Sequence, residues 1–320
     1  MNHLISIIVA AYNVEEYLSE CLQSIKNQTH DNWKAIIVND GSTDNTLQVI
    51  QELIQDDARF SLLDQPNGGV SKARNAGIQA ATGIYLTFMD GDDFWQPTFL
   101  AELLAAIQTR DVDMAYCGYT HLYIHGLQRS FSYPYASGNI LFEVVNGQTQ
   151  IHIGALLVKK ALIDRLGLSF TEGCLVGEDQ EFIWKLVAHA TVQAVPQELM
   201  MYRIRSGSVI KAKWNWKKHI HVFYACKRAT DYILQKAHLG YDQQRLSRVL
   251  YKRVAYKLYK IIWRMIKNGY VDDARRMMAN DEYKTYLSYL DIQRLAFIDK
   301  LKYKIVRSSK RFLWKIARLV

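Results

Sequence analysis

Proline is scarce in this chain of 320 residues, which contains only four prolines and 17 glycines. These counts exclude a collagen-like chain and a proline-rich disordered chain. No run of about 18 uncharged apolar residues occurs, which argues against a helix that spans a membrane. The four cysteines, at positions 21, 117, 174 and 226, lie far apart and form no CxxC pair. A zinc site or disulfide framework is therefore not expected, and a reduced cytosolic compartment fits best.

Acidic residues are scarce in the last third of the chain. Residues 211–320 hold 27 Lys and Arg but only eight Asp and Glu, whereas residues 1–210 hold 13 and 23. The corresponding formal charges are +19 and −10. Such asymmetry predicts two regions with different partners. We expect the acidic region to hold a metal or position a base, and the basic region to face phosphate groups of lipid or nucleic acid.

Short apolar runs alternate with amphipathic stretches through the first 200 residues. Leu4–Ala10 is a continuous apolar run, which is typical of a strand buried on both faces of a parallel sheet. Helical spacing follows over Val14–Gln28, and Ser42 or Thr43 is expected to cap the next helix. The other predicted strands are Trp33–Val38, Phe60–Leu63, Tyr85–Met89, Met114–Cys117, His121–Ile124 and Ile151–Val158, and the other helices are Gly69–Ala81, Pro97–Thr109 and Glu178–Ala190. This order predicts a doubly wound α/β fold.

Strand-like runs stop near Trp214, and helical patterns rich in Lys, Arg and Tyr follow. We predict helices over Trp216–His238 and Gln244–Asn268. The last stretch, Lys300–Val320, has eight basic residues and no acidic one, and a helical wheel separates its apolar from its basic residues. The sequence therefore predicts an α/β domain over residues 1–213 and a helical basic region over residues 214–320.

Polar side chains follow three of the predicted strands. Tyr12 follows the first, Asp40 ends the second, and Asp90-Gly91-Asp92-Asp93 follows the fourth. Ligands of open α/β sheets bind at the carboxyl ends of strands. Two carboxylates one residue apart can share Mg²⁺ or Mn²⁺ with substrate phosphates, and Gly91 would let a ligand approach the backbone. Asp40 can accept a hydrogen bond from a nucleotide base on which Tyr12 stacks.

Each of these motifs also has a purely structural interpretation. An Asp-rich turn can cap the next helix, and Asp40-Gly41-Ser42 also suits an ordinary strand-to-helix turn. Glu178-Asp179 begins a predicted helix, and the first turn of a helix favours carboxylates; the functional interpretation is a general base near the nucleotide. Taken alone, the acidic turn and the Glu178-Asp179 pair favour the structural interpretation, and the Asp40 segment leaves the two evenly balanced.

Taken together and in this order, the motifs resemble the family 2 glycosyltransferases of the GT-A fold. The segments that carry the resemblance are Ile5–Leu18, Ser24–Thr29, Ile37–Thr46, Asn67–Gly77, Phe88–Asp93, Glu178-Asp179 and Tyr202–Ser208. They span roughly residues 4–210, and their joint pattern is specific although each short motif is weak. The resemblance implies a GT-A fold with a doubly wound mixed sheet, followed by the helical basic region.

The resemblance also implies which residues bind the nucleotide. Tyr12 and Asp40 would bind a uracil-type base with help from the backbone near Ala10, and Arg74 would meet the ribose or the diphosphate. Many family members have proline where this chain has Ala10, but a backbone contact survives that change. The implied donor is a nucleotide-diphosphate sugar, with a UDP-sugar favoured.

The same resemblance assigns the acidic residues. Asp90, with Gly91, would touch ribose or metal, and Asp92 would be the main ligand of a divalent metal, Mn²⁺ or Mg²⁺. Asp179 would be the catalytic base, with Glu178 beside it. One base and direct attack from the opposite face would invert the configuration at the anomeric carbon.

The implied acceptor is a saccharide or lipid-linked saccharide in surface polysaccharide synthesis. The chain lacks the Gln-x-x-Arg-Trp motif and the membrane spans of processive synthases, so we expect transfer of one sugar per binding event. The composition of Lys300–Val320 suits a helix that lies on an anionic membrane surface, although a solvated helical face is the alternative. We therefore expect a cytoplasmic protein, peripheral on the inner face of the cytoplasmic membrane.

The rival functions are a nucleic-acid-binding protein and a non-catalytic scaffold, both using the basic region. Nucleic-acid binding is not expected, because it leaves the acidic strand ends unexplained. A scaffold is disfavoured because Asp40, Asp90, Asp92 and Asp179 are all present. Neither GxGxxG nor GxxxxGK[ST] occurs after the first strand, which argues against nicotinamide and P-loop enzymes.

Overall fold

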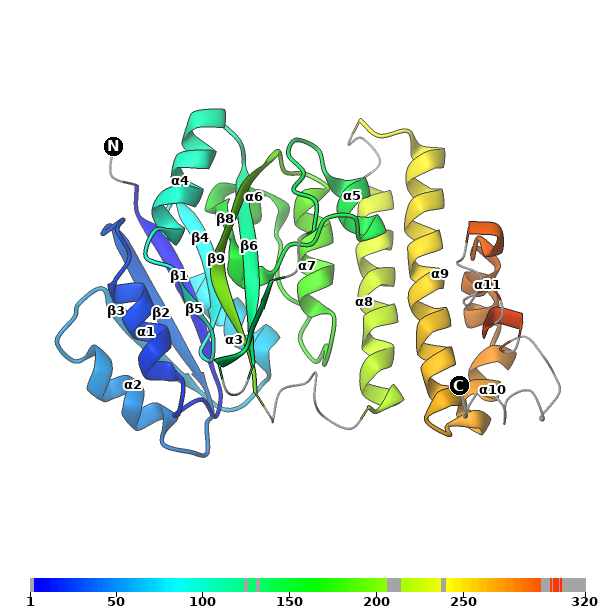
Figure 1. Ribbon diagram of the computed structural model, residues 1–320, viewed down its shortest axis with the longest axis horizontal. Helices are drawn as coiled ribbons and strands as arrows, with labels where there is room; N and C mark the ends of the chain where they lie inside the picture. Colours follow the sequence, from blue (N-terminus) through cyan, green and yellow to red (C-terminus); the bar gives the residue numbers. More distant parts are fainter. Residues whose placement is uncertain are drawn as a thin grey trace. The chain divides into compact units, whose positions relative to one another are not determined.

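The computed structural model describes residues 3–123, 126–130, 133–205, 214–236, 240–294, 300, 302–304 and 306. It divides into two compact units. The first comprises residues 1–174 and 182–212, and the second comprises residues 175–181 and 213–320. Figure 1 shows the first unit as a sheet with helices on its faces and the second as a set of helices.

The first unit is built on one mixed sheet. Its strands in the described ranges are β1 Ile5–Ala11, β2 Trp33–Asp40, β3 Phe60–Gln65, β4 Tyr85–Asp90, β5 Phe94–Trp95, β6 Met114–Tyr123, β7 Gln128–Ser130, β8 Leu156–Lys159 and β9 Val192–Ile204. They lie in the order β3-β2-β1-β4-β8-β6-β9-β5, with β7 beside β6. β1 to β4 are parallel, β8 is antiparallel to both neighbours, and β6 and β9 are parallel to each other. The carboxyl ends of β1, β2, β4, β6 and β9 therefore meet at one edge.

Helices cover both faces of this sheet. They are α1 Leu18–Lys26, α2 Thr46–Ile54, α3 Val70–Ala80, α4 Phe99–Arg110, α5 Leu141–Asn146, α6 Lys160–Leu166 and α7 Glu178–Val187, with a 3₁₀ turn η2 at Ile153–Ala155. Alternate residues of β1 point to opposite faces. Ile7 packs into the core with α1 and α4, whereas Ile8 faces Gly77 of α3. A Cβ at Gly77 would lie 2.3 Å from Ile8 Cγ2, so glycine is what allows α3 to lie this close to β1.

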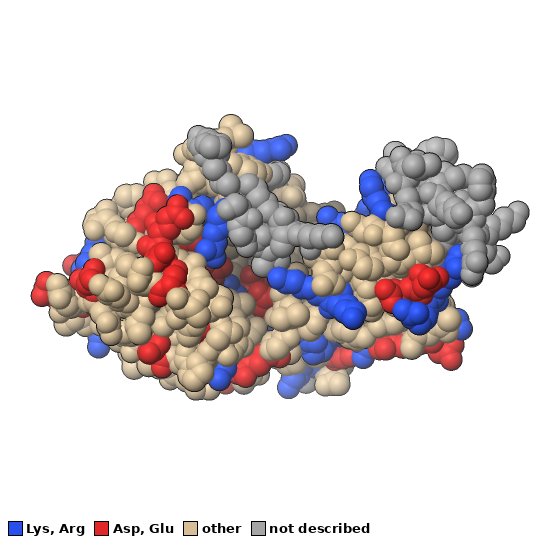
Figure 2. All heavy atoms as spheres, turned by 90° about the horizontal axis from the view of Figure 1, so that it is seen from below, with Lys and Arg blue, Asp and Glu red and all other residues tan. Residues whose placement is uncertain are grey.

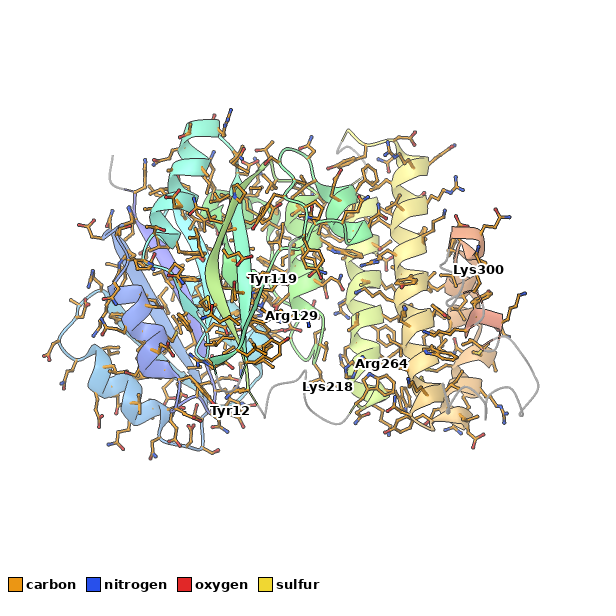
Figure 3. The ribbon with its side chains drawn as sticks, in the orientation of Figure 1. Tyr12, Tyr119, Arg129, Lys218, Arg264 and Lys300 are labelled. Carbon is orange, nitrogen blue, oxygen red and sulfur yellow. The ribbon has the colours of Figure 1, made fainter. Side chains whose placement is uncertain are left out.

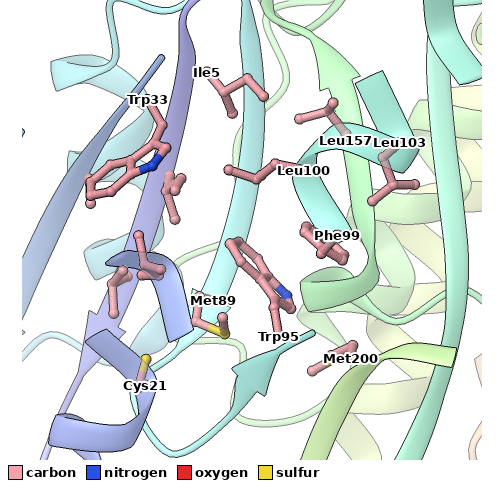
Figure 4. Close-up of a cluster of buried hydrophobic side chains, with 14 of the residues drawn as sticks. Ile5, Cys21, Trp33, Met89, Trp95, Phe99, Leu100, Leu103, Leu157 and Met200 are labelled. Atoms are coloured by element: carbon pink, nitrogen blue, oxygen red, sulfur yellow. The ribbon is translucent and has the colours of Figure 1, made fainter. Parts of the chain in front are cut away.

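The core on the α1 and α4 side is rich in large rings (Figure 4). Trp95 and Phe99 are stacked with ring centroids 4.1 Å apart and an interplanar angle of 10°. The indole N–H of Trp95 donates to the carbonyl of Gly154 at 2.7 Å, so its polar atom is satisfied inside the core. Trp33 packs edge-on against Phe60 on the β2 and β3 side.

Replacing Phe99 by alanine should destabilise the protein by about 3–5 kcal/mol, because the ring is fully buried and its removal leaves a cavity beside Trp95. Urea unfolding followed by circular dichroism measures this loss. Tyr12→Ala, at an exposed position, is the control and should unfold at the wild-type midpoint. Equal midpoints for Phe99→Ala and wild type would contradict this packing.

Several predicted elements differ from the structure, and three of the differences bear on the sheet and its edge. The predicted strand Met114–Cys117 and residues 121–123 of the predicted strand His121–Ile124 belong to one strand, β6, whose pairing with β9 shifts register around Gly118. Ile124 lies outside the described residues. The predicted strand Ile151–Val158 begins instead with the 3₁₀ turn η2 and continues as β8. The predicted cap of α2 is wrong, because Asn45 is the N-cap and Ser42 binds Asn13 and Asn39.

The second unit is helical in its described part. Its helices are α8 Trp216–Gln235, α9 Gln243–Lys267, α10 Val271–Ala279 and α11 Asp281–Ser288, with a 3₁₀ turn η3 at Ile292–Arg294. α9 contacts α8, α10 and α11, and its apolar side chains, such as Leu250, Val254 and Ile262, are fully buried. None of the described helices is long and apolar enough to cross a membrane. The predicted amphipathic helix Lys300–Val320 lies almost wholly outside the described residues.

Candidate functional site

The ends of β1 and β4 are joined by backbone pairing. Ala10 pairs with Asp90 in the parallel register, and its carbonyl accepts a hydrogen bond from Gly91 N at 2.9 Å. A Cβ at Gly91 would lie 3.0 Å from Val14 Cγ2 and 3.3 Å from the Ala10 carbonyl oxygen, so glycine here fits the turn against β1. Tyr12, just beyond β1, is 46% exposed and lies at the lower end of the sheet in Figure 3. Its ring face is therefore open to a flat ligand.

Asp40 is buried where β2 ends. Its Oδ1 accepts hydrogen bonds from Gln65 Nε2 at 2.7 Å and Gly68 N at 3.0 Å, and its Oδ2 accepts one from Gly69 N at 2.8 Å. The carboxylate thus fixes the loop that leads into α3. Each carboxylate oxygen can accept two hydrogen bonds, and Oδ2 carries one from the described residues. Asp40 therefore has a clear structural role and retains acceptor capacity on Oδ2.

Arg74 and Asp90 form a salt bridge between α3 and the end of β4. Arg74 Nη2 lies 2.7 Å from Asp90 Oδ1, and the arginine side chain is 2% exposed against 28% for the carboxylate. The guanidinium also lies over the ring of Phe170, 5.2 Å from its centroid. Arg74 is thereby held in one orientation and presents positive charge at the sheet edge.

Two arginines from the end of β9 bind the acidic turn after β4. Arg205 Nε lies 2.8 Å from Asp92 Oδ2, and Arg205 Nη1 donates to the carbonyl of Asn13 at 3.0 Å. Arg203 donates through its backbone N to Asp93 Oδ1 at 2.8 Å and through Nε to the carbonyl of Asp92 at 2.9 Å. Asp93 is buried by this contact and supports the turn. The sequence motifs gave neither arginine a role; Arg203 lies in β9 and Arg205 one residue beyond its end, and this spacing of two at a strand end is the signal that could have found them.

Burial and mutual repulsion act on these carboxylates. Burial raises the pKa of Asp92, the charge of Asp90 raises it further, and Arg205 opposes both. Burial also raises the pKa of Asp93 well above its usual value, with the charges of Asp92 and Asp90 adding to the effect. Loss of solvent and mutual repulsion therefore make the ionised form of the turn less favourable. Figure 2 views the protein from the side toward which the carboxyl ends of β1, β2 and β4 point, and acidic (red) and basic (blue) side chains lie next to one another there.

The acidic turn suits a hard divalent cation. Asp90 uses Oδ1 for Arg74 and Asp92 uses Oδ2 for Arg205, and no described side chain bonds the other oxygen of either carboxylate. A cation would offset the repulsion between Asp90 and Asp92. Within the described ranges, no group of three or more His, Cys, Asp or Glu side chains is placed to hold a metal. A cation here would take its remaining ligands from substrate and water, which is the usual arrangement for Mg²⁺.

Glu178 and Asp179 belong to the second unit, whereas the residues above belong to the first. Both are half-buried in the first turn of α7. This turn is fixed by α8: Arg228 donates to Glu181 Oε2 at 2.9 Å through Nε and 2.6 Å through Nη2, and Cys226 Sγ lies 3.4 Å from Gln180 Oε1. The acidic pair therefore stands on a rigid helix start, where the helix dipole favours its charge.

Comparison with known families and relatives gives a consistent result. The description of the matching family is "Glycosyl transferase family 2", and the match covers residues 6–164. The chain is 29% identical over 239 residues to the uncharacterized glycosyltransferase EpsJ of Bacillus subtilis (strain 168), covering 71% of this chain and 69% of EpsJ. It is 28% identical over 261 residues to the glycosyltransferase GlyG of Streptococcus pneumoniae serotype 4, covering 73% and 82%.

Solved structures share the fold at low sequence identity. S. aureus TarS 1–349 in complex with UDP-GlcNAc matches with a TM-score of 0.69 at 17% identity, covering 98% of this chain and 90% of that chain. The mannosyltransferase PcManGT from Pyrobaculum calidifontis, in complex with GDP-Man and Mn²⁺, matches with a TM-score of 0.54 at 14% identity, covering 100% and 88%. At such identities, these matches show a common architecture.

Proposed function

Because this chain is a family 2 glycosyltransferase with the GT-A fold, we propose that it transfers one sugar per binding event from a UDP-sugar to a hydroxyl group of a saccharide or lipid-linked saccharide. The observation that carries this proposal is the acidic turn Asp90–Asp93, which follows β4 at the edge where Tyr12 and Asp40 stand. A nucleotide diphosphate needs a base-binding site beside a charged site, and this edge offers both.

The nucleotide is proposed to lie across the ends of β2, β1 and β4. Tyr12 stacks on the base, Asp40 accepts a hydrogen bond from it through Oδ2, and the backbone near Ala10 contributes a further contact. Arg74 contacts the ribose or the diphosphate. The UDP-GlcNAc bound by TarS, which shares this fold, supports uridine as the nucleoside.

Removing the Tyr12 ring should weaken UDP binding without affecting the fold. Base–aromatic stacking contributes about 1–3 kcal/mol, so Tyr12→Ala should bind UDP about 5- to 150-fold more weakly. Titration calorimetry with UDP and Mn²⁺ measures the change. Tyr289→Ala is the matched control, because Tyr289 is 42% exposed and belongs to the second unit. Unchanged UDP affinity in Tyr12→Ala would exclude Tyr12 from the base site.

Asp92, with Asp90, is proposed to hold a divalent cation, Mn²⁺ or Mg²⁺. When bound, such an ion stabilises negative charge that develops on a departing diphosphate. The complex of PcManGT with GDP-Man and Mn²⁺, a protein that shares this fold, supports a divalent metal as cofactor. Arg74 and Arg205 keep both carboxylates in place, and Arg74 adds its own positive charge near the leaving group.

Asp179 is proposed as the general base that takes the proton from the acceptor hydroxyl, with Glu178 beside it. Attack of that oxygen on the anomeric carbon, from the face opposite the diphosphate, forms the new glycosidic bond as the bond to the diphosphate breaks. The configuration therefore inverts. The helix start that carries Asp179 is held by the Glu181–Arg228 ion pair, which keeps the base oriented.

The remaining proposals concern the setting of the reaction. The domain over residues 1–213 carries the nucleotide site, and the region over residues 214–320 serves the acceptor or a membrane surface. The excess of Lys and Arg in residues 211–320 supports an anionic membrane as partner. On this view the enzyme acts in the cytoplasm, at the inner face of the cytoplasmic membrane, in surface polysaccharide synthesis.

The proposal is tested with the purified protein and a panel of UDP-, GDP- and dTDP-sugars in Mn²⁺, Mg²⁺ or EDTA. Calorimetry measures binding of each donor. An enzyme-coupled assay of the released nucleoside diphosphate measures slow hydrolysis of the donor. We expect one UDP-sugar to bind and to be hydrolysed only when metal is present. Binding of a GDP- or dTDP-sugar in place of a UDP-sugar would correct the nucleoside, and binding of none of the donors would overturn the proposal.

A further inference from the structure

A group of rings lies at the sheet edge beyond the proposed nucleotide site. Tyr119, His121 and Tyr123 alternate along β6 and so share one face of the sheet. Tyr202 of β9 pairs with His121 in register, and His152 precedes η2. All five residues are half-buried. We call these five residues the ring cluster.

The rings of the cluster are in mutual contact. The centroid of His152 lies 4.8 Å from that of Tyr202 and 5.2 Å from that of Tyr119. His121 lies 5.3 Å from Tyr202 and 5.6 Å from Tyr119. Interplanar angles between 30° and 61° in these pairs show that the rings are tilted relative to one another and are not stacked. In Figure 3, Tyr119 lies toward the lower end of β6, the end of the sheet at which Tyr12 lies.

The ring cluster borders the hydrophobic core, against which Tyr119 and Tyr202 pack, but it is less buried than that core. Residues Met114 to Cys117, in the first half of β6, are at most 1% exposed. Partial exposure begins at Gly118 and Tyr119, and the side chains of the cluster carry two imidazoles and three hydroxyl groups. Rings with polar edges suit a surface that is both apolar and hydrogen-bonding.

The surroundings of the cluster favour the neutral form of its two imidazoles. The backbone N of Gly154 donates to His152 Nδ1 at 3.1 Å, so the proton of this ring is on Nε2. Burial lowers the pKa of His152 to about 4, and burial also lowers the pKa of His121. η2, which directly follows His152, contacts β4, the strand that ends at the acidic turn. The cluster therefore combines ring faces with polar ring edges, one of which, the Tyr119 hydroxyl, donates to Gln150 Oε1 at 3.2 Å.

We propose that the ring cluster binds the terminal pyranose of the acceptor saccharide, an inference that rests on the proposed transferase function. A pyranose has an apolar C–H face that packs on a ring and a rim of hydroxyl groups that bonds to imidazole and tyrosine. The order of strands along the edge is β2, β1, β4, β8, β6, β9. A nucleotide across β2, β1 and β4 leaves the ends of β6 and β9 for the acceptor, on the far side of the acidic turn.

Saturation-transfer NMR tests this assignment with two ligands in one tube. Each sample contains UDP with Mg²⁺ and one methyl β-glycoside. The glycosides, tested one at a time, are those of glucose, galactose, N-acetylglucosamine and glucuronic acid. In wild type we expect saturation of the uracil protons and of the ring C–H protons of at least one glycoside. His121→Ala and Tyr202→Leu should weaken binding of that glycoside about three- to tenfold and leave the UDP signal unchanged. Ile84→Ala is the control and should match wild type, because Ile84 is 52% exposed and precedes β4 at the opposite end of the sheet.

The outcomes separate this inference from the proposed function. Saturation of UDP but of no glycoside in wild type would overturn the ring-cluster assignment alone, as would equal glycoside signals in wild type and both variants. Failure of UDP itself to bind wild type would overturn the proposed function and this inference with it. The UDP signal also reports on folding, so a variant that loses it is set aside and the other variant decides.

Discussion

Asp92→Asn is expected to lower the rate of sugar transfer by at least about 10²–10³-fold, the loss that follows removal of one preorganised charge-stabilising group. Asparagine has almost the same shape, but its amide carries no charge for a divalent cation or for Arg205. The measurement is kcat and kcat/KM for donor hydrolysis or transfer over a titration of Mn²⁺. Asp57→Asn is the control, because Asp57 forms a comparable ion pair with Arg59 away from the sheet edge.

The same substitution should leave the folded state as stable as wild type or more stable. Burial and Asp90 raise the pKa of Asp92, so at neutral pH its ionised form is less favourable in the folded chain than in the unfolded chain. A neutral amide removes this cost at every pH above the ordinary pKa of a free aspartate. Transfer should therefore fall while the urea midpoint holds or rises, as expected when a site carries strain for function. Near wild-type turnover, or a large loss of stability, would contradict this account of the turn.

The carboxyl edge of the sheet was predictable because of how parallel strands are built. A strand buried on both faces is a continuous apolar run, so the predicted Leu4–Ala10 and the observed Ile5–Ala11 differ by one residue at each end. Polar residues directly after such runs must lie at the same edge. The spacing of the apolar runs alone therefore predicts that Asp40 and Asp90 lie near each other, and the GT-A fold class is confirmed.

The arginines of β9 could not be placed by the same reasoning. Arg203 contacts Asp92 across 111 residues of sequence, and the contact depends on β9 entering the sheet beside β6. The pattern of β6 hides that pairing, because Gly118 interrupts the apolar run and suggests two short strands. In the structure, β6 continues through Gly118 as one strand, and only its pairing register with β9 shifts there. Long-range pairing thus decides which charges meet the acidic turn.

Local hydrogen bonding also overrode a plausible helix cap. Ser42 is a favourable cap residue by type, but its hydroxyl donates to Asn39 Oδ1 at 2.6 Å and accepts from Asn13 N at 3.1 Å. These bonds tie the end of β2 to the turn after β1, next to Tyr12. A residue suited to start a helix therefore shapes the edge of the proposed base site instead, and nothing in the sequence around Ser42 distinguishes the two uses.

Asp179→Asn is expected to lower kcat by about 10²–10⁴-fold, the usual contribution of a general base. The affinity for UDP should stay within about twofold of wild type, since the nucleotide is proposed to bind through Tyr12, Asp40 and Arg74 of the first unit. If Asp179 removes the acceptor proton, the acidic limb of the wild-type pH–kcat profile should disappear in the variant. Stopped assays of transfer and calorimetry with UDP provide these two readouts.

The matched control is Asp281→Asn, which removes a carboxylate from the first turn of α11. Both variants lose a favourable charge at a helix start, a stability change of about 0.3–1 kcal/mol. If first-turn placement alone explained Asp179, the two variants would show similar small effects on stability and none on kcat. A wild-type kcat in Asp179→Asn would therefore show that this residue has only a structural role. A lower kcat with unchanged UDP affinity would show that Asp179 acts in the chemical step and not in donor binding.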